Sequence, residues 1–426
     1  MINKSSLRAV NNSRFSQHFR KPRYDSYCFA NLPATIEFLL TGKGSSALPL
    51  DVFGNLPTRY DKVIFFFIDS FGWNFFERNA EKYNFLKHML THGVVSQLTS
   101  QFPSTTAAHI TCMHTGLSVG QSGVYEWNYY EPLVDEIISP LLFSYAGDRA
   151  RPNTLNQSLV PPTDFFPAQT FYQSLADQGI TSHIFQYKGY SPSTYSDVVY
   201  RGGMPHDYKN LRDGLEQLSN LLQTENEVPG YYFLYFDRID TICHRSGPYS
   251  QRTEEEIDSF LLLMDEFFSR NMWGKASNTL FMLSADHGHG EVDPETTWYL
   301  NQRLPAITPY IKTNRAGRLI VPAGSPRDMF LYIQEEHISE AVAMLRESLA
   351  GKAEVYPTQE LLHQHIFGPE TPSQTFLGRL GNVVILPYEH ETIWWYEERR
   401  FSMHFHGHHG GLTPEEMEIP LLVAPL

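Results

Sequence analysis

Carboxylate and imidazole side chains follow several apolar runs of this 426-residue chain. The candidates for metal-binding side chains are Asp69, Asp240 with His244, Asp286 with His287, and His409. Carboxylate oxygens and imidazole nitrogens suit zinc and similar transition metals, and such a site needs no thiolate. We therefore expect these four segments to meet in a metal site.

Each of the four segments has a simpler explanation when it is taken alone. Asp69 could cap a following helix, and Asp240 and His244, four residues apart, could be an ordinary pair on a helix surface. Asp286 could lie in a turn, and the histidine-rich stretch 404–409 could be a solvated loop. Four such segments after buried strands are improbable by coincidence, so the metal site is the favoured interpretation.

The stretch from Gln101 to His109 adds two adjacent hydroxyl groups, Thr105 and Thr106. A strand-like run ends just before Pro103, and small helix-compatible residues follow, so a helix should begin at the threonines. Unpaired N–H groups and the positive end of the helix dipole would stabilise an anion there, or a hydroxyl becoming an alkoxide. Simple capping of the helix is the alternative.

The composition is that of a large folded protein: 42% of the residues are hydrophobic and 14% aromatic. A net charge of −14 disfavours binding to nucleic-acid polymers or anionic membranes. Three scattered cysteines form no disulfide framework. The N-terminus shows no secretory signal, and the longest apolar run, 63–68, is too short to span a bilayer. We expect a cytoplasmic protein without a membrane span.

Apolar strand-like runs alternate with helical periodicity along the chain, which predicts an α/β fold with a mainly parallel sheet covered by helices on both faces. Strands are expected at 62–69, 93–102, 180–186, 231–236, 279–284 and 419–423, and helices at 74–90, 168–178, 211–222 and 253–268. In such sheets ligands bind at the carboxyl ends of the strands, where the acidic residues lie.

We expect residues 1–426 to form a single catalytic domain, with residues 1–60 as an N-terminal arm. A strand at 330–333, a helix at 338–349 and a strand at 383–386 predict a small inserted cap subdomain within 290–400. The aromatic, proline-rich stretch 124–166 is expected to be a long functional loop.

Together these motifs resemble the alkaline phosphatase superfamily and, within it, the type I phosphodiesterase / nucleotide pyrophosphatase family. The matching pieces are Phe-Phe-Ile-Asp69-Ser-Phe-Gly, Phe-Pro-Ser-Thr-Thr106-Ala-Ala, Asp240-x-x-x-His244-x-x-Gly-Pro, Ala-Asp286-His287-Gly and Gly-x-His409-Gly-Gly. They occur in the family's order across residues 63–411, and as a set they are specific.

The resemblance implies an alkaline-phosphatase-like three-layer sandwich and two divalent metal ions, zinc or, as the alternative, manganese. One ion would be held by Asp240, His244 and His409, and the other by Asp69, Asp286, His287 and Thr106. Thr106 would attack phosphorus in line and form a phospho-threonine intermediate, which water then hydrolyses. The implied substrate is a small phosphate ester, with nucleotides among the candidates.

This chain departs from the family pattern at several positions. Ala107-Ala-His109 replaces the Pro-Asn-His run that commonly follows the nucleophile, which keeps Thr105 open as the alternative to Thr106. Trp127 occupies the place of an asparagine that binds a phosphate oxygen, with Asn128 beside it. Tyr125, Trp127 and Asn128 are therefore candidates for substrate binding.

Other residues near these motifs are expected to play supporting roles. The segment 187–193 is a further candidate for the wall of a pocket. His289 and His408 are expected to support the metal ligands or to be solvated, with His408 a possible substitute for His409.

Three other functions stay open on the sequence. The first is another phosphoryl enzyme of the superfamily, namely a phosphomonoesterase, phosphonate hydrolase or phosphomutase. The second, a sulfatase, is disfavoured because the chain has no Cys-x-Pro-x-Arg stretch. The third is a non-catalytic, metal-containing binding module, which the complete ligand set argues against.

Overall fold

The computed structural model describes residues 1–148, 152–224 and 228–426, and its centre is a seven-stranded sheet with the order β2-β17-β9-β1-β8-β6-β7. Its strands are β1 (Lys62–Ile68), β2 (Val94–Thr99), β6 (Thr181–Tyr187), β7 (Met204–Tyr208), β8 (Gly230–Phe236), β9 (Thr279–Ser284) and β17 (Glu418–Pro425). The strands from β9 to β7 run parallel, whereas β17 is antiparallel to both β2 and β9. The predicted mainly parallel α/β fold is confirmed.

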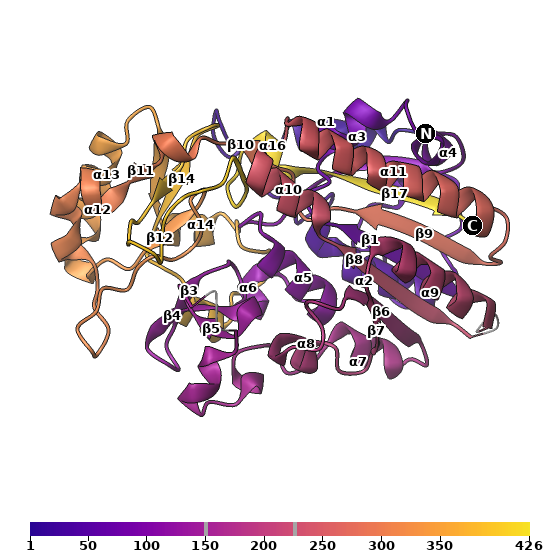
Figure 1. Cartoon of the computed structure of the whole chain (residues 1–426), viewed down its shortest axis with the longest axis horizontal. Helices are drawn as coiled ribbons and strands as arrows, with labels where there is room; N and C mark the ends of the chain where they lie inside the picture. Colours follow the sequence, from indigo (N-terminus) through magenta and orange to yellow (C-terminus); the bar gives the residue numbers. More distant parts are fainter. Residues whose placement is uncertain (149–151, 225–227) are drawn as a thin grey trace.

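Every residue of β1, β8 and β9 is buried, because helices cover both faces of the sheet. In Figure 1 the long helix α11 crosses one face while α2, α5 and α7 lie on the other. The first face carries α3 (Trp73–Asn79), α4 (Asn84–His92), α9 (Leu211–Thr224) and α11 (Gln251–Asn271). The second carries α2 (Leu32–Thr41), α5 (Thr106–Thr115) and α7 (Phe171–Ala176). Helix α11 buries the apolar stripe expected from its spacing: Ile257, Phe260, Leu261, Met264 and Phe268.

A second, smaller body lies at the end of the molecule farthest from the two chain termini (Figure 1). Its antiparallel sheet has the order β12-β14-β13, built from β12 (Met329–Leu331), β13 (Ala353–Pro357) and β14 (Val383–Pro387). The helices around it are α12 (Leu300–Arg303), α13 (Ile338–Ser348), α14 (Thr358–His363) and α15 (Gln374–Arg379). Two strands and the helix α13 lie where the sequence places them, whereas β13 was not foreseen. The division of the chain into a catalytic domain with an insertion stays a prediction.

Short elements complete the chain, and some occupy the stretch 124–166 that was expected to be a loop. A three-stranded meander forms there from β3 (Tyr129–Glu131), β4 (Glu136–Ser139) and β5 (Ser144–Tyr145). Two further strand pairs are β10 (Gly290–Glu291) with β16 (Gly407–His408), and β11 (Trp298–Tyr299) with β15 (Ile393–Trp394). The remaining helices are α1 (Lys4–Asn11), α6 (Val119–Ser122), α8 (Thr194–Val199), α10 (Arg238–Ser246) and α16 (Pro414–Met417). None of the helices in the described ranges combines the length and apolar character that a bilayer crossing requires.

A buried ion pair joins the smaller body to the sheet. Arg327, just before β12, donates to both carboxylate oxygens of Glu416 in α16, at 2.9 and 3.0 Å, and to the carbonyl of Tyr388 at 2.7 Å. Both charged side chains are almost completely buried. Glu416 also accepts a hydrogen bond from the N–H of Gly411 at 3.1 Å. This pair therefore fixes the loop that carries His409 against the smaller body.

Breaking this ion pair should destabilise the protein strongly. Arg327→Met leaves Glu416 buried without its partner, a situation that costs about 3–5 kcal/mol. Arg399→Met is the control, because the side chain of Arg399 is 90% exposed and such changes cost within about 0.5 kcal/mol. Urea unfolding should show a clearly lower midpoint for Arg327→Met alone. Equal midpoints for the two variants would show that the pair contributes nothing to stability.

Candidate metal centre and nucleophile

Three carboxylates meet at one edge of the central sheet. Asp69 follows β1, Asp286 follows β9 by two residues, and Asp240 lies in α10, which begins two residues after β8. Since β8, β1 and β9 are adjacent and parallel, their carboxyl ends bring these residues together. Asp69 and Asp286 are buried, and the side chain of Asp240 is 15% exposed.

The first group of possible ligands surrounds one oxygen of Asp240. Its Oδ1 lies 3.5 Å from His244 Nε2, 3.6 Å from His409 Nε2 and 3.3 Å from His289 Nε2. His244 Nε2 and His409 Nε2 are 3.2 Å apart. Three residues of this group were predicted to share a metal, whereas His289 was expected to play a supporting or solvated role.

The second group surrounds His287. Its Nε2 lies 3.2 Å from Asp286 Oδ2, 3.5 Å from Asp69 Oδ1 and 3.3 Å from Thr106 Oγ1. The structure thus brings together the four residues predicted for the second ion. Asp240 approaches this group as well, since one of its oxygens lies within 4.8 Å of ligand atoms of Asp69 and His287. The two groups are therefore contiguous, and the rings of His287 and His409 stack 3.6 Å apart.

The electrostatics of this edge fit a cation. Burial and the charges of Asp286 and Asp240 raise the pKa of Asp69 well above its usual range. Burial would also raise the pKa of Asp240, but the neighbouring imidazoles, with His244 first, hold it well below that range. Within the described ranges, none of the three carboxylates forms an ion pair with Lys or Arg, and Asp286 Oδ2 is buried without a hydrogen bond. Divalent cations would compensate this buried negative charge.

The imidazoles are oriented for metal binding. The Nδ1–H groups of His244, His287 and His409 donate to the carbonyls of Gly407, Gly288 and Ser104, at 2.9, 2.9 and 3.0 Å. A carbonyl only accepts, so in a neutral ring Nε2 keeps its lone pair directed at the carboxylates. At His287 burial would lower the pKa, but the neighbouring carboxylate of Asp286 raises it overall, so this ring loses a proton when it binds a cation. Burial lowers the pKa of His244 to about 4 and that of His409 well below its usual range, which keeps both rings in the neutral form that binds metal.

The nucleophile loop presents Thr106 rather than Thr105. Helix α5 begins at Thr106, whose Oγ1 lies 3.4 and 3.3 Å from the two carboxylate oxygens of Asp69. The hydroxyl of Thr105 instead faces the buried carboxyl group of Glu126. Ser104 holds the loop in place, because its hydroxyl donates to the carbonyl of Gly411 at 2.7 Å. The geometry thus favours Thr106 as the residue that could attack a bound substrate.

Ser70 connects the two groups of possible ligands and was not singled out by its sequence. Its hydroxyl donates to Asp240 Oδ1 at 2.8 Å, and its N–H donates to Asp286 Oδ1 at 3.1 Å. The residue has a φ of 63°, a left-handed conformation that costs a non-glycine residue about 1–2 kcal/mol. No spacing signal could reveal this role, which depends on the turn after β1.

Tyr235 is a second residue that the sequence analysis did not identify. Its hydroxyl donates to Asp69 Oδ2 at 2.5 Å. Tyr235 lies inside an apolar strand, and only the pairing of Phe67 with Tyr235 in the register of β1 and β8 brings it beside Asp69.

The three candidates for substrate binding have different surroundings. Tyr125 is fully buried and stacks on Tyr129 at 5.1 Å, so its packing lends no support to a contact with substrate. The amide oxygen of Asn128 accepts from the hydroxyl of Ser139 at 2.7 Å, which fixes this side chain against β4. Trp127 is partly exposed. A role for these residues in binding substrate stays a prediction.

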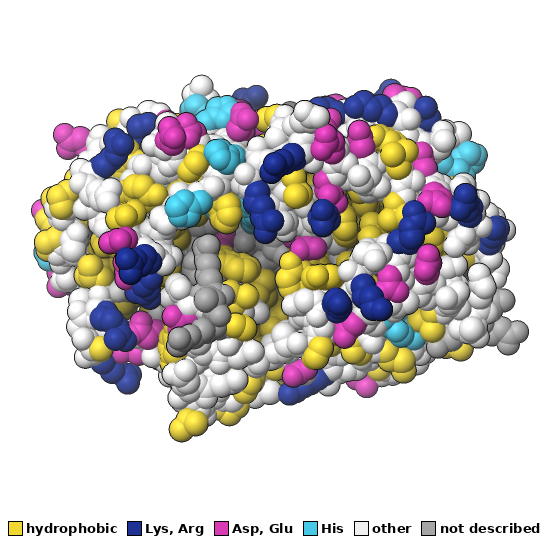
Figure 2. All heavy atoms as spheres, in the orientation of Figure 1, with side chains coloured by type: hydrophobic (Ala, Val, Ile, Leu, Met, Phe, Trp, Pro, Cys, Tyr) yellow, Lys and Arg dark blue, Asp and Glu magenta, His cyan; other side chains and the backbone are white. Residues whose placement is uncertain are grey.

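The surface near the ligand groups is hollowed. Figure 2 shows a depression with hydrophobic side chains in it, which Figure 1 places between α10 and the region of α6 and the β3–β5 meander. Tyr190, in the predicted wall segment 187–193, is 47% exposed and donates to Asp237 Oδ2 at 2.5 Å. Burial and then Asp237 raise the pKa of Tyr190, and the charges of Asp69 and Asp240 add to this shift.

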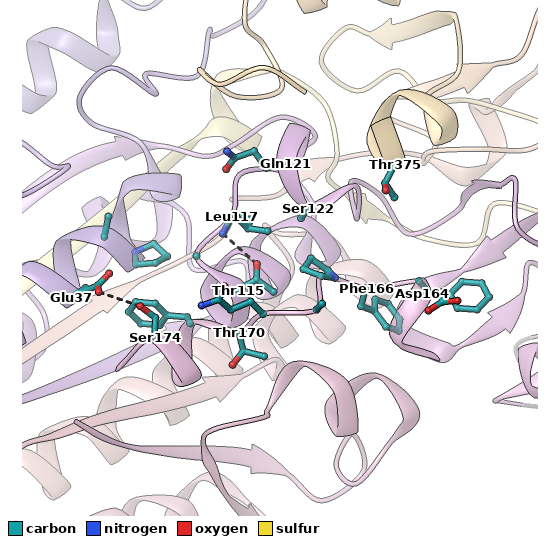
Figure 3. Close-up of a pocket in the computed structure, with 18 residues that line it drawn as sticks. Glu37, Thr115, Leu117, Gln121, Ser122, Asp164, Phe166, Thr170, Ser174 and Thr375 are labelled. Atoms are coloured by element: carbon teal, nitrogen blue, oxygen red, sulfur yellow. Dashed lines mark hydrogen bonds between the residues drawn. The ribbon is translucent and has the colours of Figure 1, made fainter. Parts of the chain in front are cut away.

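A separate cavity of about 570 Å³ lies at the other end of α5, beside Thr115 and Gly116 (Figure 3). The ten residues of α5 span about 15 Å, so this cavity is distinct from the Thr106 end. Its charged lining residues are Glu37 and Asp164, and Glu37 is already bonded to Ser174 at 3.2 Å (Figure 3). Among the described residues, none lines both this cavity and the metal-binding groups.

Removing the Ser70 hydroxyl should weaken metal binding. We expect Ser70→Ala to lower zinc affinity by about 10–100-fold, the usual effect of losing a group that orients a ligand. Ser70→Gly is the matched variant, because it also lacks the hydroxyl but adopts a positive φ without strain. Competition with a chromogenic chelator should show weaker binding for both variants. Wild-type affinity in Ser70→Gly would show that the hydroxyl is not needed.

Comparison with known proteins agrees with this geometry. Residues 63–412 match the family model described as type I phosphodiesterase / nucleotide pyrophosphatase. Ectonucleotide pyrophosphatase/phosphodiesterase family member 3 of Rattus norvegicus is 23% identical over 298 residues, which are 67% of this chain and 31% of that protein. The corresponding protein of Mus musculus is 23% identical over 286 residues, 64% of this chain and 30% of its own length. The chain thus spans about a third of these relatives.

Solved structures show the same fold. An inactive threonine-to-alanine variant of murine ectonucleotide pyrophosphatase/phosphodiesterase 5, in complex with AMP, superposes with a TM-score of 0.62 at 16% identity, covering 84% of this chain and 87% of that one. The human protein gives 0.62 at 15% identity, with coverage of 85% and 87%. Since the family model covers most of the chain and its motifs converge at one edge of the sheet, the protein belongs to the type I phosphodiesterase / nucleotide pyrophosphatase family.

Proposed function

We propose that the protein is a metal-dependent phosphodiesterase that uses Thr106 as its nucleophile. The observation that carries the proposal is the position of Thr106 Oγ1, about equally far from Asp69 and from His287 Nε2, at the start of a helix. Asp240, His244 and His409 would hold one divalent cation, and Asp69, Asp286 and His287 the other. When bound, two such cations polarise the phosphoryl group and stabilise the attacking and leaving oxygens.

The chain's own residues supply the remaining chemistry. The Thr106 hydroxyl directs its proton toward the carboxylate of Asp69, and its oxygen attacks phosphorus to form a phospho-threonine ester. The leaving oxygen takes up this proton and departs as the alcohol. Water then attacks the same phosphorus, and one of its protons returns to the Thr106 oxygen as the ester bond breaks. The free N–H groups at the start of α5 face the non-bridging phosphate oxygens. The burial of Asp69 and Asp286 limits access of water to the charged groups.

Charge favours a diester over a monoester. Two divalent cations bring four positive charges against the three carboxylates Asp69, Asp240 and Asp286, and the imidazoles of His244, His287 and His409 add none because a metal-binding imidazole is neutral. One positive charge remains, which matches the single negative charge of a phosphate diester. A monoester carries close to two negative charges at neutral pH, and the three carboxylates have no ion pair with Lys or Arg in the described parts of the chain.

Nucleotide diesters and pyrophosphates are the natural substrates that we propose first. The support is the family of the chain and the AMP bound to a structural neighbour. The exposed ring of Tyr190, whose hydroxyl contacts Asp237 just before α10, offers an apolar surface for a base or another aromatic leaving group. Zinc as the metal, with manganese as the alternative, and action in the cytoplasm stay predictions.

Loss of the nucleophile should abolish turnover. We expect Thr106→Ala to reduce hydrolysis of bis-para-nitrophenyl phosphate by at least about 1,000-fold, since the covalent route is lost. Metal content should stay the same, because the carboxylates and imidazoles remain. Thr105→Ala is the matched control and should keep activity within about tenfold of the wild type. Activity that survives in Thr106→Ala and disappears in Thr105→Ala would transfer the role to Thr105.

The charge argument gives a second test. The zinc-loaded protein should hydrolyse bis-para-nitrophenyl phosphate with a kcat/KM at least about tenfold above that for para-nitrophenyl phosphate, a difference of about 1.4 kcal/mol. Preference for the monoester would contradict the charge balance and assign the protein to the phosphomonoesterases. With two metal ions bound, inactivity toward both compounds and toward a panel of nucleotide diesters would favour a non-catalytic binding module.

A further inference from the structure

His289 lies in the first group of ligands with both ring nitrogens unsatisfied. The residue is 4% exposed, and neither Nδ1 nor Nε2 forms a hydrogen bond with any described residue. A buried imidazole normally has a hydrogen-bond partner. Its Nε2 instead lies 3.3 Å from Asp240 Oδ1, the oxygen that also faces His244 and His409.

The spacing of the four ligand atoms matches one coordination sphere. Four ligands about 2.0–2.2 Å from a tetrahedral zinc ion lie about 3.3–3.6 Å from one another. Asp240 Oδ1 is 3.3, 3.5 and 3.6 Å from the Nε2 atoms of His289, His244 and His409, and the last two are 3.2 Å apart. All four atoms lie within 4.8 Å of one another.

The surrounding backbone holds the ring of His289 in this position. A Cβ atom at Gly407 would lie 2.8 Å from His289 Nδ1 and 2.6 Å from the carbonyl of Cys243, so only glycine allows this close approach. Gly407 also accepts the Nδ1–H of His244 at 2.9 Å. Gly407 therefore packs against His289 and orients His244. Its strand β16 pairs with β10, which begins directly after His289.

We propose that His289 is a fourth protein ligand of the first cation, in addition to Asp240, His244 and His409. This inference rests on the metal centre of the proposed function. Catalytic zinc sites usually have three protein ligands and one open position. A site with four protein ligands retains its ion more tightly, and a phosphate oxygen must enter as a fifth ligand. The second site, with Asp69, Asp286 and His287, keeps the open position.

The direct test compares zinc binding and cobalt(II) spectra of the wild type, His289→Gln and His408→Gln. His408, in β16, is the control because it is a neighbouring buried histidine whose ring nitrogens lie outside the four-atom group. Chelator competition should show the tighter zinc constant weakened by at least about tenfold in His289→Gln and unchanged in His408→Gln. The visible spectrum of the first cobalt equivalent should change in His289→Gln only.

A rescue experiment separates ligation from a packing role. His289→Ala leaves space for an imidazole, and added imidazole should restore both the cobalt spectrum and the tighter zinc constant. Circular dichroism of the metal-free variants controls for folding. Unchanged zinc constants in His289→Gln, or a weakened constant that imidazole does not restore, would overturn the proposal.

The outcome is independent of the proposed catalytic activity. A protein that hydrolyses diesters but binds zinc equally well without His289 refutes the fourth ligand and leaves the phosphodiesterase proposal intact. A protein whose zinc binding depends on His289 but that hydrolyses no phosphate ester supports the fourth ligand and refutes the phosphodiesterase proposal.

Discussion

Three carboxylates crowd the ends of three neighbouring parallel strands, where little water reaches them. Bringing Asp69, Asp240 and Asp286 together is costly because like charges repel strongly in a medium of low dielectric. The pairing of β8, β1 and β9 imposes this proximity, and their fully buried side chains anchor the strands. The need for cations follows from this one concentration of negative charge, and the imidazoles and Thr106 are held around it.

Contacts between distant parts of the chain hold the remaining groups against the carboxylates. The loop before α5 and the turn after β16 bind each other, since Ser104 N–H donates to the carbonyl of Gly410 and His409 Nδ1 donates to the carbonyl of Ser104. The Arg327–Glu416 pair fixes the same turn against the smaller body. The nucleophile and the late histidine are thus positioned as one unit, although they lie about 300 residues apart in the sequence.

Much of the fold follows from the sequence, because continuous apolar runs such as 62–69 are typical of strands buried on both faces. The acidic residues after those runs predicted the site, since parallel strands bring their carboxyl ends together. Ser70, Tyr235 and His289 could not be assigned in this way. Their contacts depend on a left-handed turn, on the register of β1 with β8 and on the close approach of a glycine backbone, none of which leaves a pattern of spacing. The β3–β5 meander was missed because its strands are only two to four residues long.

The proposed reaction depends on a covalent bond between Thr106 Oγ1 and phosphorus. The most direct measurement is the stereochemical course of hydrolysis of a chiral phosphorothioate diester in oxygen-18-labelled water. Each in-line displacement inverts the configuration at phosphorus, so a reaction through a threonine ester proceeds with two inversions. A covalent Thr106 intermediate therefore gives net retention. Net inversion would show that water attacks the substrate directly, and it would contradict the role of Thr106 as the nucleophile.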